Sequence, residues 1–138
     1  MAHADTLQRI YDRINAHDLD GFADHLAEDF VEHEEAPGLA PTKEGTKQFF
    51  AMYMTAFPDL HFEVEDLLES GDKVVGRFRA TGTHEEDFMG IPPTGKSVDV
   101  QGIDIIRFAD DGLAIEHWGV FDALGMLQQL GVAPAPPG

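Results

Sequence analysis

The chain has 138 residues, the length of one domain, and 43% of them are hydrophobic, as in an ordinary globular protein. Nine Lys and Arg residues stand against 26 Asp and Glu residues, so the formal net charge is −17 at pH 7. Because phosphate groups attract basic surfaces, this charge argues against nucleic acid and against anionic membranes as partners. The absence of cysteine excludes disulfides, cysteine nucleophiles and thiolate metal ligands. With no signal-peptide pattern and no long apolar run, we expect a soluble, cytoplasmic protein.

Helices are predicted for most of the first half of the chain. Asp5 is the candidate N-cap of a first helix, whose apolar residues recur at helical spacing. These apolar residues are Leu7, Ile10, Tyr11 and Ile14. Asp18 or Asp20 is the candidate cap of a short second helix. Its apolar residues are Phe22, Ala23 and Leu26. Thr42 is predicted to cap a third helix over residues 43–57.

An irregular loop is predicted from Phe30 to Thr42, because its prolines and glycine disfavour regular structure. It contains the run Glu32-His33-Glu34-Glu35. Such an acidic run usually faces water. The alternative is that Glu32 or His33 points into a binding pocket.

Four strands are predicted in the second half of the chain. In the first, Phe62, Val64 and Asp66 alternate with Glu63 and Glu65. Three more strands are expected over residues 73–83, 97–108 and 113–121. The last two are joined by the turn Asp110-Asp111-Gly112, which is typical of an antiparallel hairpin.

The rest of the second half is predicted to consist of a loop and a short helix. The loop runs from His84 to Lys96, and we expect His84 to be exposed. Asp122 is the candidate cap of the last helix, which Gly131 ends.

Helices followed by a run of strands indicate an α+β domain, with helices packed on one face of a curved antiparallel sheet. We expect a single domain over residues 1–131 and a disordered, proline-rich tail over residues 132–138.

Several segments of the chain resemble the SnoaL-like polyketide cyclases, which belong to the nuclear transport factor 2-like superfamily. The segments are FPDLHFEVEDLL, TGTH, FMGIPPTGK, GIDIIRFADDG and EHWGVFDALGMLQQLG. The resemblance implies a cone-shaped sheet wrapped on helices around an apolar pocket, and a homodimer or homotetramer formed through the outer sheet face. It also implies closure of a polyketide ring by intramolecular aldol condensation, without metal or cofactor. Fold alone does not fix function, because the superfamily also contains isomerases, epoxide hydrolases and non-catalytic binders.

The polar residues that the resemblance implies for a cyclase site differ at each position in this chain. The family's acid/base aspartate falls on Gly119, its assisting histidine on Asp104, and an asparagine near the pocket mouth on Glu32. The scaffold therefore carries over, but the cyclase chemistry does not carry over residue by residue.

The alternation of side chains along two predicted strands makes Asp104 and His117 the candidate catalytic residues. Each is the lone polar side chain in an otherwise apolar row of its strand, and the hairpin turn makes the two strands neighbours. A carboxylate beside an imidazole is a usable general base, because the carboxylate fixes the tautomer and stabilises the charged ring. The alternative is a buried hydrogen bond that only satisfies two interior groups.

Other residues are weaker candidates. Arg77 and Arg79 share one strand face, where they either bind a substrate carboxylate or pair with surface carboxylates. Trp118 points opposite to His117, towards an expected subunit contact. The residues expected to contact substrate are Glu32, His33, Tyr53, Arg79, Gly119 and Phe121. No ligand spacing typical of a metal site is present, so we expect no metal.

Two classes of function follow. The first is a cofactor-free enzyme acting on a small, apolar, oxygenated molecule, by proton transfer next to a carbonyl or by water addition to a strained ring as in an epoxide hydrolase. The second is a non-catalytic protein that binds a small hydrophobic molecule. A polar pair inside an apolar pocket favours the first, and Gly119 favours the second.

Overall fold

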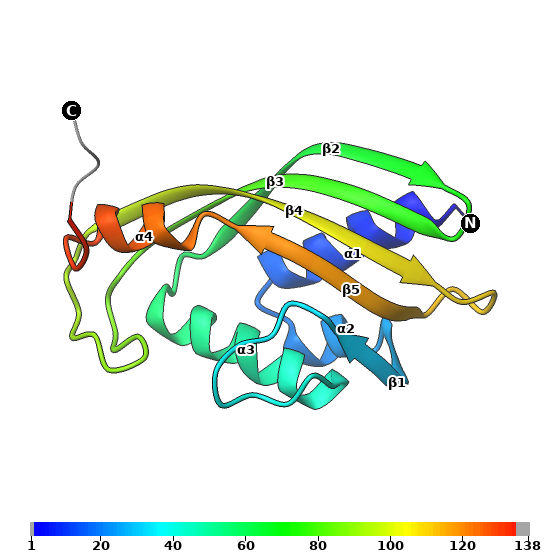
Figure 1. The fold of residues 1–138 in the computed structure, drawn as a ribbon, viewed down its shortest axis with the longest axis horizontal. Helices are drawn as coiled ribbons and strands as arrows, with labels where there is room; N and C mark the ends of the chain where they lie inside the picture. Colours follow the sequence, from blue (N-terminus) through cyan, green and yellow to red (C-terminus); the bar gives the residue numbers. More distant parts are fainter. Residues whose placement is uncertain (1, 135–138) are drawn as a thin grey trace.

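A computed structural model describes residues 2–134, and within them four helices lie against one curved sheet of five strands (Figure 1). The helices are α1 (His3–Asn15), α2 (Leu19–Ala23), α3 (Lys43–Ala56) and α4 (Ala123–Gln129). The strands are β1 (Leu26–Glu32), β2 (His61–Ser70), β3 (Lys73–Thr83), β4 (Ser97–Phe108) and β5 (Ala114–Phe121). The predicted α+β class is confirmed. Of the expected tail, residues 135–138 lie outside the described residues.

The sheet has the order β1-β5-β4-β3-β2, with β2 to β5 antiparallel and β1 parallel to β5. In Figure 1, α1 lies beneath β2 to β4. Helices α2 and α3 lie towards the opposite edge of the sheet, which is formed by β1. The concave face of the sheet therefore meets the helices, and the opposite, outer face does not. In the part of the chain described here, no helix is long and apolar enough to cross a membrane.

Capping residues set several of the helix starts as predicted. Asp18 accepts a hydrogen bond from the Gly21 amide at 2.9 Å, and Asp122 does the same for Gly125 at 2.8 Å. Thr42 accepts from the Gly45 amide at 3.2 Å. The expected cap Asp5 is wrong, because α1 begins at His3 and Asp5 lies within its first turn.

Strand β1 was not predicted, and the expected meander of four strands is therefore incomplete. Buried and exposed residues do not alternate along β1, because its pairing with β5 shifts between Leu26 and Val31. Leu26, placed in the second helix by its apolar character, begins this strand instead. The run from Glu32 to Glu35 thus follows directly on a strand at the edge of the sheet.

Bulges also change which residues face inward. In β2 the register shifts between Val64 and Asp66, so Asp66 lies on the outer face instead of sharing a face with Phe62. In β5 the register shifts so that Ala114 is fully buried opposite Phe108, and the predicted inward row does not extend to Ile115. Beyond the bulge, alternation holds as predicted from His117 to Phe121.

Candidate active site

A cavity of about 110 Å³ lies between the concave face of the sheet and helices α1 and α3. Its walls are mainly aromatic and aliphatic side chains, among them Phe50, Phe78 and Val100. Of the residues expected to contact substrate, Tyr53, Phe121 and Glu32 line this cavity. The other polar side chains on its walls are Tyr11, Glu34, Glu35, Thr46, Asp104 and His117. An apolar cavity with a few convergent polar groups is the usual form of a small-molecule site.

Asp104 and His117 meet on the concave face, so the predicted contact is confirmed. Asp104 pairs with Gly119 across the β4–β5 ladder, and His117 pairs with Ile106, which makes the two side chains diagonal neighbours. His117 Nε2 lies 2.7 Å from Asp104 Oδ1. The other oxygen of Asp104 accepts a hydrogen bond of 2.6 Å from the Tyr11 hydroxyl on α1.

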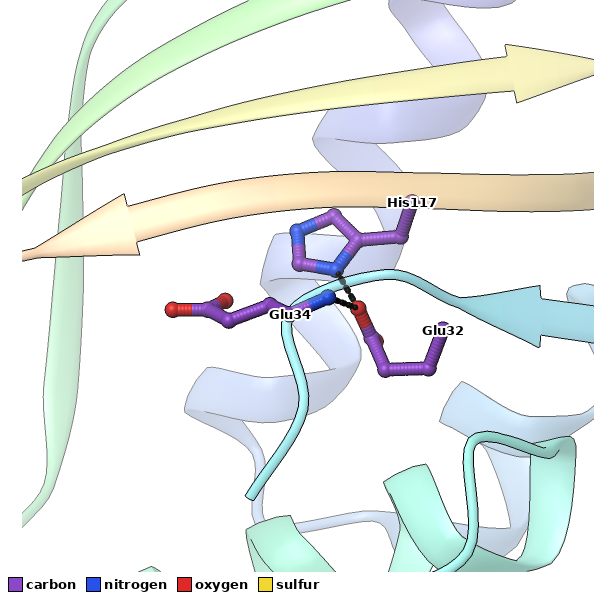
Figure 2. A group of neighbouring side chains, drawn as sticks. All are labelled: Glu32, Glu34 and His117. Atoms are coloured by element: carbon purple, nitrogen blue, oxygen red, sulfur yellow. Dashed lines mark hydrogen bonds and ion pairs between the residues drawn. The ribbon is translucent and has the colours of Figure 1, made fainter.

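Glu32 supplies a second carboxylate to the same ring. It ends β1 directly opposite His117 in the parallel ladder, and its Oε1 lies 2.5 Å from His117 Nδ1 (Figure 2). The backbone N–H of Glu34 also donates to this oxygen, at 2.9 Å. The three side chains Glu32, His117 and Asp104 form a continuous chain, which we call the His117 cluster.

The His117 ring is positively charged within this cluster. Burial alone lowers the pKa of the ring, but hydrogen bonds and charges from Asp104 and Glu32 outweigh burial and raise it to about 10. A charged imidazole carries a proton on each ring nitrogen, so both nitrogens of His117 donate to the carboxylate oxygens. At neutral pH the ring is therefore a hydrogen-bond donor and does not accept a proton.

Glu34 is a functional candidate that the sequence reasoning missed. It follows β1 by two residues, and its side chain runs alongside the His117 ring (Figure 2). Within residues 2–134 no donor hydrogen-bonds to its carboxylate, although its own backbone N–H is bound to Glu32. Burial raises the pKa of this carboxyl to about 7, helped by the charges of Asp104 and Glu32 and opposed by that of His117.

The sequence did contain a signal for Glu34. Glu32 and Glu34 are two residues apart at the end of a strand, a spacing that places side chains on the same face. Because β1 was not predicted, the run was interpreted as a solvated loop with Glu32 and His33 as its only pocket candidates.

Two expected substrate contacts lie away from the cavity. His33 hydrogen-bonds to Glu116 at 2.8 Å and stacks on Trp118, on the outer face of the sheet. Arg79 also lies on the outer face, where its Nε donates to Asp99 at 3.1 Å. These two expectations are therefore wrong in position. The alternative for the arginines, pairing with surface carboxylates, is confirmed for Arg79 and for Arg77, which pairs with Asp66 at 2.7 Å.

His84 was expected to be exposed, and this is wrong. It is fully buried beneath the 84–96 loop, packed on Phe57, with its Nδ1 3.0 Å from the Thr94 hydroxyl. Trp118 does point away from His117, as predicted, and Lys73 lies over its ring.

A metal ion does not fit the hydrogen bonding of this site. Glu32, Glu34 and His117 each offer one atom within 4.8 Å of the others, as a metal site requires. However, a metal needs a neutral imidazole with a free lone pair. Both nitrogens of His117 are already engaged by carboxylates, so we assign no metal ligands.

Comparison with known proteins places the chain in a family. The model of the SnoaL-like polyketide cyclases matches residues 4–130. Among curated proteins there is no match. The chain is similar to the crystal structure of AclR from Streptomyces galilaeus, described as a "putative hydroxylase", at 30% identity and a TM-score of 0.87, covering 98% of this chain and 88% of that one.

Two further crystal structures support the same assignment. IdmH from Streptomyces antibioticus, described as a "putative polyketide cyclase", shares 34% identity over 96% of this chain and all of its own, with a TM-score of 0.82. A "putative polyketide cyclase" from Bacillus cereus shares 32% identity over 93% of this chain and 79% of that one, with a TM-score of 0.80. The chain therefore belongs to the SnoaL-like polyketide cyclase family.

Proposed function

We propose that this protein is a cofactor-independent acid–base enzyme, acting next to a carbonyl group of a small, apolar, oxygenated molecule. The reaction class is an intramolecular aldol cyclisation or an isomerisation. The observation that carries the proposal is the His117 cluster, a charged and hydrogen-bonded group in the wall of an otherwise apolar cavity. Charged groups fixed in such a setting act strongly on charge that develops in a transition state.

Asp104 and His117 are the proposed catalytic pair, and the charge on His117 decides their roles. Asp104 and Glu32 keep His117 charged, and a charged ring in an apolar cavity stabilises the negative charge that develops on an enolate oxygen. His117 acts in this scheme as the electrophile, since its pKa of about 10 leaves it protonated at pH 7. Tyr53 and Phe121 would pack against the apolar body of the substrate.

Exchange of hydrogen for deuterium tests the proposal. The probe is 2-tetralone in D2O, and the rate of exchange at its two α-carbons is followed by proton NMR. We expect the protein to accelerate exchange, to do so equally in the presence of a metal chelator, and to lose this activity in His117→Gln. Loss of activity with the chelator would contradict cofactor independence.

A non-catalytic pocket protein is the second candidate, and Gly119 favours it. The resemblance places the family's acid/base aspartate at this position, where this chain has no side chain. Saturation-transfer NMR with 2-tetralone separates the two candidates. Binding without accelerated exchange would support the non-catalytic function and contradict the enzyme.

We also propose self-association into a homodimer or homotetramer through the outer face of the sheet. Val120 and Ile103 are neighbours there, and 71% and 44% of their respective surfaces are exposed. Apolar surface of this kind is typical of protein contacts. A cytoplasmic location stays a prediction from the sequence.

A further inference from the structure

We propose that Glu34, which lies beside His117 in the cavity wall over Gly119, takes a proton from the carbon next to the substrate carbonyl while the charge of His117 stabilises the carbonyl oxygen. This inference rests on the proposed function and names its proton-transfer residue. It assigns the role that a side chain at position 119 would have to a residue from another segment of the chain.

The close packing on Gly119 supports the inference. A Cβ atom placed on Gly119 would lie 2.7 Å from His117 Nε2 and 2.8 Å from Glu34 Oε1, closer than a side chain can come without displacing them. The His117 ring and the Glu34 carboxylate therefore close over this glycine, and both line the apolar cavity. The absence of a side chain at position 119 thus lets a cation and a carboxylate reach the same part of the cavity wall.

Glu34 differs from the other two carboxylates in having a free acceptor. Both oxygens of Asp104 accept hydrogen bonds, from Tyr11 and His117. Glu32 Oε1 accepts from the His117 ring and from the Glu34 backbone. By contrast, no donor in the described chain engages the Glu34 carboxylate. Of the three, Glu34 is therefore best placed to accept a proton from a substrate.

The surroundings of Glu34 fit this role electrostatically. The groups that face it are Glu32 from β1, Asp104 from β4, His117 from β5 and Tyr53 from α3. Burial, followed by the charge of Glu34, raises the pKa of Tyr53, so that phenol stays neutral. A Glu34 pKa of about 7 makes the carboxylate a stronger base than an exposed glutamate, and a large fraction of it is ionised at neutral pH.

The step balances in atoms and electrons. The α C–H bond of the substrate breaks and its proton forms an O–H bond to Glu34. The C–H electron pair becomes the new C=C bond of the enolate, and the carbonyl π pair moves to the oxygen, whose negative charge the His117 ring stabilises by its positive charge. Return of a proton from Glu34 to the same carbon, after the carboxyl has exchanged with solvent, completes hydrogen exchange. Where the enolate is conjugated with a second C=C bond, return to the far end of the dienolate completes an isomerisation. In a cyclisation the enolate carbon attacks a second carbonyl of the same molecule, and Glu34 returns its proton to the new alkoxide.

The test compares Glu34→Gln, Glu34→Asp and Gly119→Ala with wild type in the 2-tetralone exchange assay, with folding checked by circular dichroism. We expect Glu34→Gln to lower the exchange rate by ~10²–10⁴-fold, the usual range for loss of a general base. Gly119→Ala should lower it strongly, because the added methyl group displaces His117 or Glu34 from the cavity wall. Glu34→Asp, which keeps a base one methylene shorter, should keep partial activity and the pH dependence. Glu85→Gln removes the same charge from an exposed site outside the cavity and should match wild type.

The dependence of the rate on pH distinguishes a base from a structural residue. The base acts when deprotonated, so the wild-type rate should rise with a midpoint near pH 7, and it should fall above about pH 10 as His117 loses its proton. The first transition should disappear in Glu34→Gln.

Two outcomes overturn different claims. A Glu34→Gln protein with the wild-type rate and profile, beside an inactive His117→Gln, would refute the role of Glu34 and leave the proposed function standing. A wild-type protein that does not accelerate exchange would contradict the proposed function itself, and with it the inference.

Discussion

Tyr11, Asp104, His117 and Glu32 join four elements through three hydrogen bonds, each between 2.5 and 2.7 Å. Tyr11 belongs to α1, Asp104 to β4, His117 to β5 and Glu32 to β1. Since His117 is the only cation in this chain of contacts, its charge offsets repulsion between two carboxylates that lie on either side of one ring. The two carboxylates therefore raise the pKa of His117 against the effect of burial, and Asp104 adds to the effect of burial in raising the pKa of Tyr11.

Replacing Asp104 should remove activity and leave the fold intact. In Asp104→Asn the charge that raises the pKa of His117 on its Nε2 side is gone, so the ring becomes a poorer cation and a poorer electrophile. We expect a fall of ~10²–10³-fold in the 2-tetralone exchange rate, the range for loss of one group that stabilises a developing oxyanion, with an unchanged circular dichroism spectrum. Asp99→Asn, on the outer face of the same strand, is the control. Full activity in Asp104→Asn would rule out a catalytic role for this residue.

His117 should also make the stability of the protein depend on pH. Its pKa is raised from 6.5 to about 10 on folding, so its stabilising contribution is complete below pH 6.5 and is lost as the pH rises through about 10. Removal of one partner from a buried ion pair costs about 3–5 kcal/mol. At pH 6 we therefore expect the free energy of unfolding of His117→Gln to be lower than that of wild type by about 3–5 kcal/mol.

Urea unfolding of wild type and His117→Gln at pH 6, 8 and 10.5 measures this effect. Because other groups titrate near pH 10 in both proteins, the informative quantity is the difference between the two unfolding free energies. This difference should shrink towards pH 10.5. A constant difference would mean that the ring is not charged in the folded protein.

The loop between β1 and α3 positions Glu34, and its path depends on a close approach to α3. The loop closes back on itself, since the Glu32 amide donates to the Pro41 carbonyl at 3.1 Å. Gly45, in the first turn of α3, is buried against Ala40, and a Cβ atom there would lie 1.8 Å from the Ala40 carbonyl oxygen. A backbone atom cannot rotate away as a side chain can, so the loop would have to move.

Gly45→Ala should therefore lower both stability and activity, although Gly45 is not one of the residues proposed to act on the substrate. We expect a loss of about 1–3 kcal/mol in stability from overcrowding, together with a lower exchange rate because Glu34 shifts with its loop. Thermal unfolding and the 2-tetralone assay measure the two effects. Gln48→Ala, at an exposed position on the same helix, should change neither. Wild-type activity in a destabilised Gly45→Ala would show that the loop does not set the position of Glu34.

An element could be predicted from the sequence where its pattern depends only on residues close together in the chain. Strands β3 and β4 were predicted with the observed bounds, because their patterns are regular and a turn or loop marks each end. The Asp104–His117 contact followed from alternation and the hairpin turn. Strand β1 could not be predicted in this way, since its partner β5 is some 90 residues later in the chain and a bulge disrupts its pattern. Glu34 was missed with β1, because its burial depends on that pairing.

At the scale of the whole molecule, the outer face of the sheet is expected to bury its apolar patch by self-association. The patch includes Val120, Ile103 and the nearby Trp118. Light scattering at micromolar concentration should show a dimer or tetramer. Val120→Lys, which places a charge in the patch, should shift the assembly towards monomer and keep the fold. A monomeric wild-type protein would contradict the prediction.

Charge should limit the stability of the molecule as a whole. A net charge of −17 on 138 residues repels itself in the compact state more than in the extended chain. Salt shortens the range of this repulsion, from about 30 Å at 0.01 M to about 10 Å at 0.1 M. Exposed ion pairs such as Arg77–Asp66 weaken over the same range, but such pairs contribute only about 0–1 kcal/mol each. The melting temperature should therefore rise from 10 mM to 150 mM NaCl in differential scanning fluorimetry, and equally with KCl if screening is the cause. No change, or a fall, would mean that the acidic residues are too dispersed for their repulsion to outweigh the lost ion pairs.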